Sequence, residues 1–163
     1  MAEIPAYYQS EMAAALPGQV SDTSAYNIDG ACVVDGDADI LVGVAVQIAS
    51  VDPLGHKLIL GMAAGKKPYG IAIRSHFQTD SSGANMVYKS GSGINVMTKG
   101  RVWMRSSDAT LTAQAYGTPL KIDVNGLANT SAEETNIETG WIYTGSVTTF
   151  KGIKLAEVQL LQL

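Results

Sequence analysis

The sequence predicts an all-β protein: a single compact β-barrel or β-sandwich built from two related β units, with an extended or short-helical N-terminal arm. Three observations lead to this fold class. Apolar residues alternate with small or polar residues at a period of two, the 17 glycines recur at turn positions, and one pattern of strand, turn and strand occurs twice. Many short strands joined by regular turns are typical of barrels and sandwiches.

The length and composition allow one domain with a core that needs no covalent support. A chain of 163 residues can bury roughly 70% of the surface that its unfolded form exposes. Hydrophobic residues make up 46% of the chain and charged residues 16%, which is a globular profile. The single cysteine, Cys32, cannot form an internal disulfide, so stability must come from packing or from partners.

The net charge, the N-terminal residues and the length of the apolar stretches argue against nucleic-acid binding, export and membrane insertion. The formal net charge is −4 and the longest basic run is Lys66-Lys67, so the basic patch of a nucleic-acid binder is missing. The N-terminus lacks a signal-peptide pattern, and no apolar stretch is long enough for a membrane span. We expect synthesis in a cytoplasm and no membrane partner.

Residues 1–24 are predicted to form the arm, ahead of a β-barrel or β-sandwich domain at residues 25–163. Ser10 to Leu16 could form a short helical turn that Pro17-Gly18 ends. Such an arm folds back on its own core or docks on a neighbouring subunit, and the residue pattern fits both arrangements. The candidate contact residues are apolar or aromatic and are spaced three to five apart, apart from two adjacent tyrosines: Ile4, Tyr7, Tyr8, Met12 and Leu16.

The first β unit begins near Gly43. Residues Ile40 to Ile48 alternate and predict a strand with one buried face. A turn at Asp52-Pro53-Leu54-Gly55 follows, with Pro at the second position, and Lys57 to Leu60 is the expected return strand. Tyr69 to Phe77 predicts the third strand.

The middle of the chain carries three short strand candidates, at residues 86–88, 94–97 and 101–105. In the last, Val102 and Met104 are expected to face inward. Arg101, Trp103 and Arg105 then face outward, either as a surface cation–π stack or as contact surface for a partner.

The second β unit runs from Gly117 to Tyr143. Gly117 to Ile122 repeats the first strand, Asn125-Gly126 predicts a type I′ hairpin turn, and Gly140 to Tyr143 repeats the third strand. Gly152 to Leu163 is expected to be a closing strand. Trp141 in this unit is a second candidate contact residue.

Fragments that resemble chemical motifs fail on spacing, so we expect no catalytic, metal or cofactor site. Gly61 to Lys67 is one residue short of a phosphate-binding loop and lacks its Ser or Thr. Asp35 to Asp39 has calcium-loop spacing, but the sixth position is Ile40 rather than Gly, so we interpret it as a solvated acidic turn. Neither His56 nor His76 has a second ligand at metal spacing.

Taken together, the arm, Gly100 to Trp103, Gly117 to Gly126 and Gly140 to Tyr143 resemble the structural cement or decoration proteins of tailed-phage capsids. The resemblance implies a virion protein without catalytic activity. It would be made in the host bacterial cytoplasm, bind the outside of the icosahedral shell and bridge major capsid subunits. It also implies association with copies of itself, with a trimer favoured and a dimer possible.

Two rival functions belong to other classes. A phage tail or fibre domain could bind a host glycan if Trp103 and Trp141 were exposed for stacking on sugar rings. A small enzyme, such as a head-maturation hydrolase, would need a nucleophile that no motif in the chain anchors.

Overall fold

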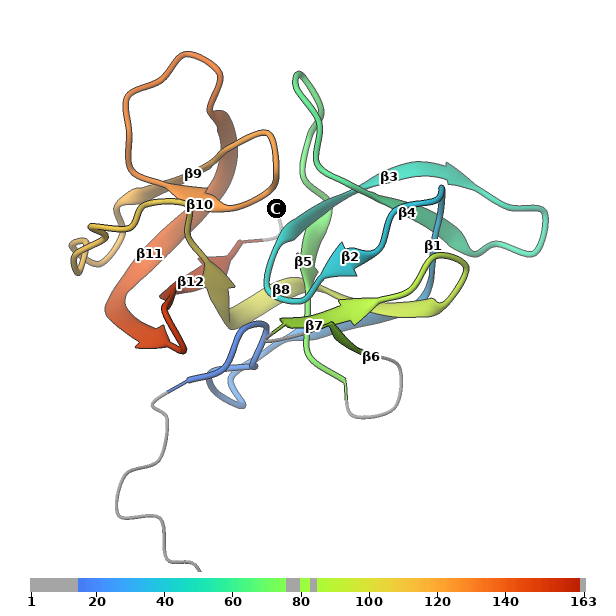
Figure 1. Ribbon diagram of the computed structural model, residues 1–163, viewed down its shortest axis with the longest axis horizontal. Coiled ribbons are helices and arrows are strands. Elements are labelled where there is room, and N and C mark those ends of the chain that lie inside the picture. Colours follow the sequence, from blue (N-terminus) through green and yellow to red (C-terminus); the bar gives the residue numbers. More distant parts are fainter. Residues whose placement is uncertain (1–14, 76–79, 83–84, 162–163) are drawn as a thin grey trace, which may run out of the picture.

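The computed structural model describes residues 15–75, 80–82 and 85–161, and it confirms an all-β fold with a closed barrel. Within these ranges every regular element is a strand (Figure 1). The strands are β1 (Asn27–Val34), β2 (Ile40–Leu41), β3 (Ala45–Val51), β4 (Lys57–Gly61), β5 (Gly70–Ala72), β6 (Asp80–Ser82), β7 (Asn85–Tyr88), β8 (Gly93–Arg105), β9 (Pro119–Ile122), β10 (Ala128–Asn129), β11 (Ile137–Phe150) and β12 (Ile153–Leu160).

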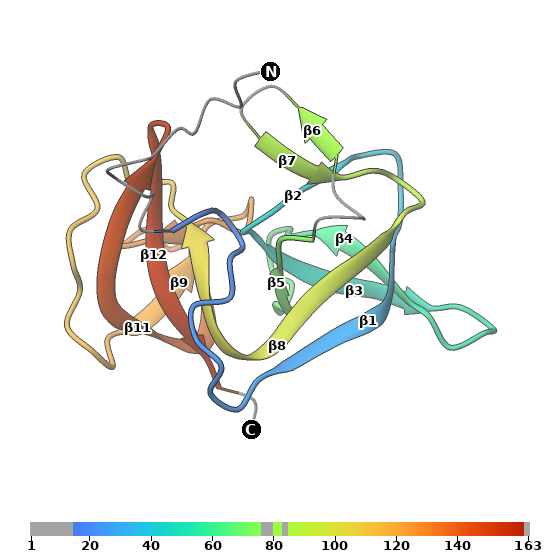
Figure 2. The same ribbon diagram turned by 90° about the horizontal axis from the view of Figure 1, so that it is seen from below.

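Five strands form a closed ring, which we call ring 1. Around it, β1 pairs with β4 in parallel, and β4–β3, β3–β5, β5–β8 and β8–β1 pair antiparallel. The ring and the small β2–β7–β6 sheet beside it are visible in Figure 2. Its core consists of buried apolar residues: Cys32, Val34, Ile40, Val42, Val44, Val46, Ile59, Ala72, Tyr88, Ile94 and Val96.

The second half of β8 begins a further ring, ring 2. Here β8–β12, β12–β11, β11–β9 and β9–β10 pair antiparallel. A parallel bridge between Ser106 and Ala128 brings β10 back to the end of β8. The Ser106 hydroxyl also donates to the Ala128 carbonyl at 2.8 Å. A second core cluster fills this half of the molecule, with Trp141, Tyr143, Leu120, Ile122, Val102 and Met104 among its members.

The two rings have the same connectivity. In chain order, ring 1 uses β1, β3, β4, β5 and the first half of β8, and ring 2 uses the second half of β8, β9, β10, β11 and β12. The second strand of each ring, β3 or β9, pairs with the next two strands of that ring. The last strand, β8 or β12, pairs with the strand before it and with the first strand of the ring, β1 or β8. The first strand also meets the third in parallel, as β1 meets β4 and the end of β8 meets β10. The predicted pair of related units is therefore present, and the units share β8.

Backbone hydrogen bonds repeat as well. At the start of the first unit, Gly43 N donates to Ala72 O at 2.8 Å and Ala72 N donates to Val44 O at 2.9 Å. The same two bonds recur in the second unit, from Gly117 N to Tyr143 O at 3.0 Å and from Tyr143 N to Thr118 O at 2.9 Å. Both glycines have positive φ, 85° and 88°, which a residue with a side chain rarely adopts.

The turns of the two units share one hydrogen-bond frame. Asp52 N donates to His56 O, Gly55 N donates to Asp52 O, and the Asp52 carboxylate accepts from the Leu54 and His56 amides. In the second unit Asp123, Asn125, Gly126 and Leu127 make the same four bonds. An aspartate that caps its own turn in this way is a common turn former.

This frame shows that the predicted type I′ turn at Asn125-Gly126 is wrong. Only Gly126 has positive φ there, and the loop closes from Asp123 to Leu127. In the described part of the chain, two successive residues with positive φ occur at Lys151 (46°) and Gly152 (80°), between paired Phe150 and Ile153. The true two-residue hairpin joins β11 to β12.

Two strand predictions also change in extent. The expected strand from Ile40 to Ile48 is interrupted at Gly43, although Val42, Val44 and Val46 are buried as predicted. The candidates at 94–97 and 101–105 join into the single strand β8, which curves strongly between the rings (Figure 2). Gly100 (φ 116°) lies in this bend, where an added Cβ would stand 2.7 Å from Tyr26 Cβ.

Candidate functional site

The candidate site is the place where the N-terminal segment meets β8. Gly18 N donates to Trp103 O at 2.8 Å, Trp103 N to Gln19 O at 2.9 Å, and Ser21 N to Arg101 O at 3.0 Å. Val20 and Val102 form an antiparallel bridge. Residues 16–22, which we call the arm root, therefore cover the edge of β8 opposite β12.

The arm root is also tied to ring 1. Arg74 N donates to Gly18 O at 2.8 Å, and a Cβ added at Gly18 would stand 2.3 Å from Val42 Cγ1. Gly18 has φ 68°. Only glycine fits this crowded position without displacing neighbours, so the Pro17-Gly18 pair fixes where the arm root enters the fold.

Arg101 and Trp103 lie on the outer face of β8, as predicted, and Val102 and Met104 are fully buried beneath them. Arg101 bonds to the Asp22 carboxylate at 3.1 Å and to Gln159 Oε1 at 3.4 Å. A hydrogen bond from the Ser24 hydroxyl, together with the Arg101 charge, lowers the pKa of Asp22. No sequence signal pairs Asp22 with Arg101, because 79 residues separate them.

Trp103 is partly buried beside a carboxylate that two hydroxyls hold in place. Its cross-strand neighbour on β12 is Glu157. Glu157 accepts hydrogen bonds from the Ser21 and Thr144 hydroxyls, which come from the arm root and from β11. The Glu157 side chain beside Trp103 is thus held in place by the arm root and by β11.

The outward position predicted for Arg105 is wrong. Arg105 is 6% exposed, and its Nε donates to Val42 O at 2.7 Å and its Nη1 to Asn85 Oδ1 at 2.8 Å. Burial lowers the pKa of its guanidinium. Strict alternation puts Arg105 on the face of Trp103, but the end of β8 lies against the Val42–Gly43 turn, where Arg105 N donates to Gly43 O. Arg105 links the rings.

Trp141 is also buried, contrary to the prediction of an exposed ring. It is 5% exposed and belongs to the second core cluster, together with Tyr143 two residues later on the same face of β11. Trp141 therefore packs within the second core cluster.

Most of the predicted arm contacts, namely Ile4, Tyr7, Tyr8 and Met12, lie outside the described residues. Leu16 is partly buried, and its amide donates to Gln19 Oε1 at 3.0 Å. Ala15, the first described residue, is 1% exposed. The described chain therefore begins at a point that is packed against the fold.

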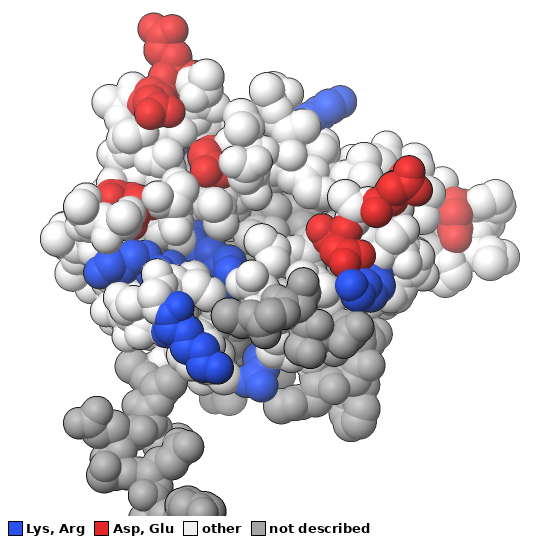
Figure 3. Space-filling view, in the orientation of Figure 1, with Lys and Arg blue, Asp and Glu red and all other residues white. Residues whose placement is uncertain are grey.

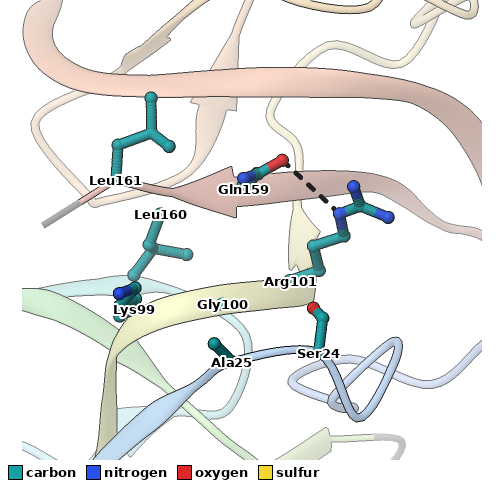
Figure 4. A pocket seen from close by; sticks show the side chains of 8 residues that line it. All are labelled: Ser24, Ala25, Lys99, Gly100, Arg101, Gln159, Leu160 and Leu161. Carbon is teal, nitrogen blue, oxygen red and sulfur yellow. Dashed lines mark hydrogen bonds between the residues drawn. The ribbon is translucent and has the colours of Figure 1, made fainter.

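A shallow pocket of about 270 Å³ adjoins this site. Ser24 and Ala25 lie on one side, Lys99 to Arg101 in the middle, and Gln159 to Leu161 on the other, as Figure 4 shows. Lys99 and Arg101 make the pocket basic, and the dashed line in Figure 4 is the Arg101–Gln159 bond. An acidic side chain of a protein partner would fit this chemistry.

The described surface carries few charges. In Figure 3 charged side chains of both signs are dispersed over a mostly uncharged face, with several acidic groups on projecting loops. Among the described residues no group of three or more His, Cys, Asp and Glu side chains could hold a metal ion. The described residues form no helix that is long and apolar enough to cross a membrane.

Comparisons with known proteins agree with the fold. A family model described as "Structural cement protein (E217 gp24/Pam3 gp6)" matches residues 4–161. A chain in the solved structure described as "The capsid of Myoviridae Phage XM1" has a similar fold, with a TM-score of 0.68 and 16% identity over 94% of each chain. No curated protein matches the sequence.

Proposed function

Because the chain belongs to the family of phage structural cement proteins, we propose that it binds the outside of an icosahedral phage capsid and bridges major capsid subunits. It stabilises the shell by non-covalent contacts alone. Its partners are capsid proteins and its place is the virion. The tail-fibre alternative has no support from the comparisons, and burial of Trp141 removes one of its two proposed sugar-stacking rings.

The observation that carries this proposal within the molecule is the anchored arm root. Residues 16–22 are bonded along β8, so the point from which the arm would extend is fixed beside Arg101 and Trp103. A segment that leaves a rigid body at a fixed point can reach a neighbouring subunit at high effective concentration. Ile4, Tyr7, Tyr8, Met12 and Leu16 supply apolar contacts in this proposal, and Arg101 and Trp103 supply the adjoining surface.

Many weak contacts, each repeated over the shell, then act together. Arg and aromatic residues at such surfaces carry much of the binding energy. Because a bound cement stabilises the assembled state and not the dissociated subunits, its effect on the shell increases with occupancy.

Truncation tests the arm. We expect deletion of residues 1–14 to leave the melting temperature within about 2 °C of the full-length value, because the arm root remains. Binding to shells that lack the cement should fall by at least tenfold in a co-sedimentation assay. Full-strength binding by the truncated protein would show that the arm has no docking role.

A longer deletion is the matched control for folding. Removal of residues 1–22 takes away the bonds to Arg101 and Trp103, which at about 1 kcal/mol each should cost about 3 kcal/mol of unfolding free energy. Chemical denaturation measures this loss. Equal stability of the two truncated proteins would contradict the anchoring described here.

A further inference from the structure

The two units of one molecule contact each other through a turn. The turn of the second unit docks on the first unit, where Ala45 N donates to Gly126 O at 2.8 Å. A Cβ added at Gly126 would stand 2.4 Å from Ala45 O and 3.1 Å from Met62 Cγ. The docked turn thus meets the first residue of β3 and the residue just after β4, and Leu127 packs against the core of ring 1.

The equivalent turn of the first unit has no such contact among the described residues. Asp52 to His56 has the same hydrogen-bond frame, but a Cβ added at Gly55 would meet nothing within 4 Å. Leu54 is 82% exposed and Val51 is 59% exposed. The β3–β4 hairpin that carries this turn projects from the body at the right of Figure 1. We call it the free turn.

The equivalent receiving place on the second unit is also open. Ala45 begins β3 and Met62 follows β4, and the matching positions are Pro119, which begins β9, and Thr130, which follows β10. Both residues line a pocket of about 230 Å³, which we call the β9 pocket. Its other lining residues include Thr118, Lys121, Ala132 and Tyr143.

The β9 pocket contains a hydrogen-bonding group that the fold leaves unused. Tyr143 is 2% exposed, and its hydroxyl is buried without a hydrogen-bond partner. Burial, and to a lesser degree the charge of Asp108, raises the pKa of Tyr143 to about 12, so the hydroxyl keeps its proton near neutral pH. Pro119 lacks the amide that Ala45 uses to bind a turn, so the bond from Ala45 N to Gly126 O has no counterpart at the β9 pocket.

We propose that the free turn of one copy docks in the β9 pocket of a second copy, at the positions that match those where the turn of the second unit docks on the first unit within one molecule. The contact is heterologous, because it joins two different surfaces. A heterologous contact closes into a ring when the rotation between successive copies closes, and a closed ring is the arrangement that we propose.

Self-association of the purified full-length protein is the first test. Analytical ultracentrifugation over a concentration series should show a closed oligomer. Leu54→Glu on the turn and Ala132→Arg at the pocket should each weaken association by at least tenfold. Both sites are exposed, so their folding should be unchanged. The matched controls, Ala64→Glu and Ala63→Arg, lie at other exposed positions and should associate as the wild type does.

Cross-linking tests the geometry. A Leu54→Cys chain mixed with a tagged Ala132→Cys chain should form a mixed disulfide on mild oxidation, whereas Leu54→Cys mixed with Ala63→Cys should not. Cys32 is buried and contributes little background. The mixtures are oxidised both in solution and on cement-free shells, so weak association is captured where local concentration is high. No mixed disulfide in either setting overturns the proposal.

Shell binding separates this inference from the proposed function. If capsid binding persists while Leu54→Glu and Ala132→Arg leave self-association unchanged, the ring contact is wrong and the cement function stands. If Leu54→Glu abolishes binding of monomers to shells and self-association is unaffected, the free turn docks on the capsid instead, which also overturns the ring contact.

Discussion

Asp29 is the residue that ties three segments of ring 1 together. Its carboxylate accepts from Lys57 Nζ at 2.7 Å, from the Tyr69 hydroxyl at 2.5 Å and from the Ala31 amide at 2.9 Å. Burial alone would raise its pKa, but the hydrogen bonds from Lys57 and Tyr69 outweigh that effect and lower the pKa to about 2. The folded protein therefore favours the ionised form.

This cluster predicts a specific acid sensitivity. Because the folded pKa of Asp29 lies below the unfolded value near 3.9, its contribution is fully present above about pH 5 and is lost as the pH falls toward 2. The contribution is at most about 2 kcal/mol. Thermal melts from pH 7 to pH 2 should show Asp29→Asn less stable than wild type at pH 7. The two proteins should converge near pH 2, and a constant gap would contradict this assignment.

Single residues also show which side-chain orientations the sequence can predict and which it cannot. Alternation placed Val102, Trp103 and Met104 correctly, because strand faces follow a period of two. It failed for Arg105 and Trp141. The partners of Arg105, Val42 and Asn85, are 63 and 20 residues away, and Trp141 is covered by strands that no local pattern places. Burial of a long polar or aromatic side chain depends on distant contacts.

At the scale of elements, two turns with one hydrogen-bond frame have different surroundings. Gly126 is pressed against Ala45 of the other unit, and Gly55 is open. Both have positive φ, 77° and 88°, so an alanine at either site incurs a similar backbone strain of about 1–2 kcal/mol. The difference between the two substitutions isolates the contact between units.

Gly126→Ala should therefore destabilise the protein by at least about 1 kcal/mol more than Gly55→Ala, because a Cβ there overlaps a backbone oxygen. Urea denaturation of the two variants beside wild type measures the difference. Equal losses of unfolding free energy in the two variants would mean that the turn of the second unit makes no close contact with the first unit.

The same elements explain which parts of the fold were predictable. The repeat was visible because both units use a glycine start, an aspartate turn and a glycine return. The turn type at Asn125-Gly126 was not, since an aspartate two residues earlier captures the amides and lengthens the loop. Continuity of β8 was hidden because Gly100 resembles a break and instead forms a bend.

At the scale of the whole molecule, the shared strand makes the two units one cooperative body. β8 is the last strand of ring 1 and the first of ring 2, and the arm root and Arg105 join the rings. Neither ring is complete without β8. The sequence predicted two units, but it could not show that they share a strand, because pairing over long separations leaves no local signal.

Cooperativity can be measured with one substitution in each core. Ile59 and Leu120 are 0% and 1% exposed, in the first and second core clusters respectively. Ile59→Ala and Leu120→Ala should each cost about 2–5 kcal/mol and lower the same single calorimetric transition. Two resolved transitions, with each variant shifting a different one, would show that the rings unfold independently.

The direction of the bonds in the arm root has a mechanical consequence. Residues 18–21 run antiparallel to β8 and their hydrogen bonds lie across the strand axis, so a pull along that axis loads these bonds in shear. Bonds in shear must break together, whereas bonds at a peeled end break one after another. Tension that a swelling shell transmits through the arm would therefore meet its greatest resistance where the arm joins the body, and β8 would distribute that force to both rings.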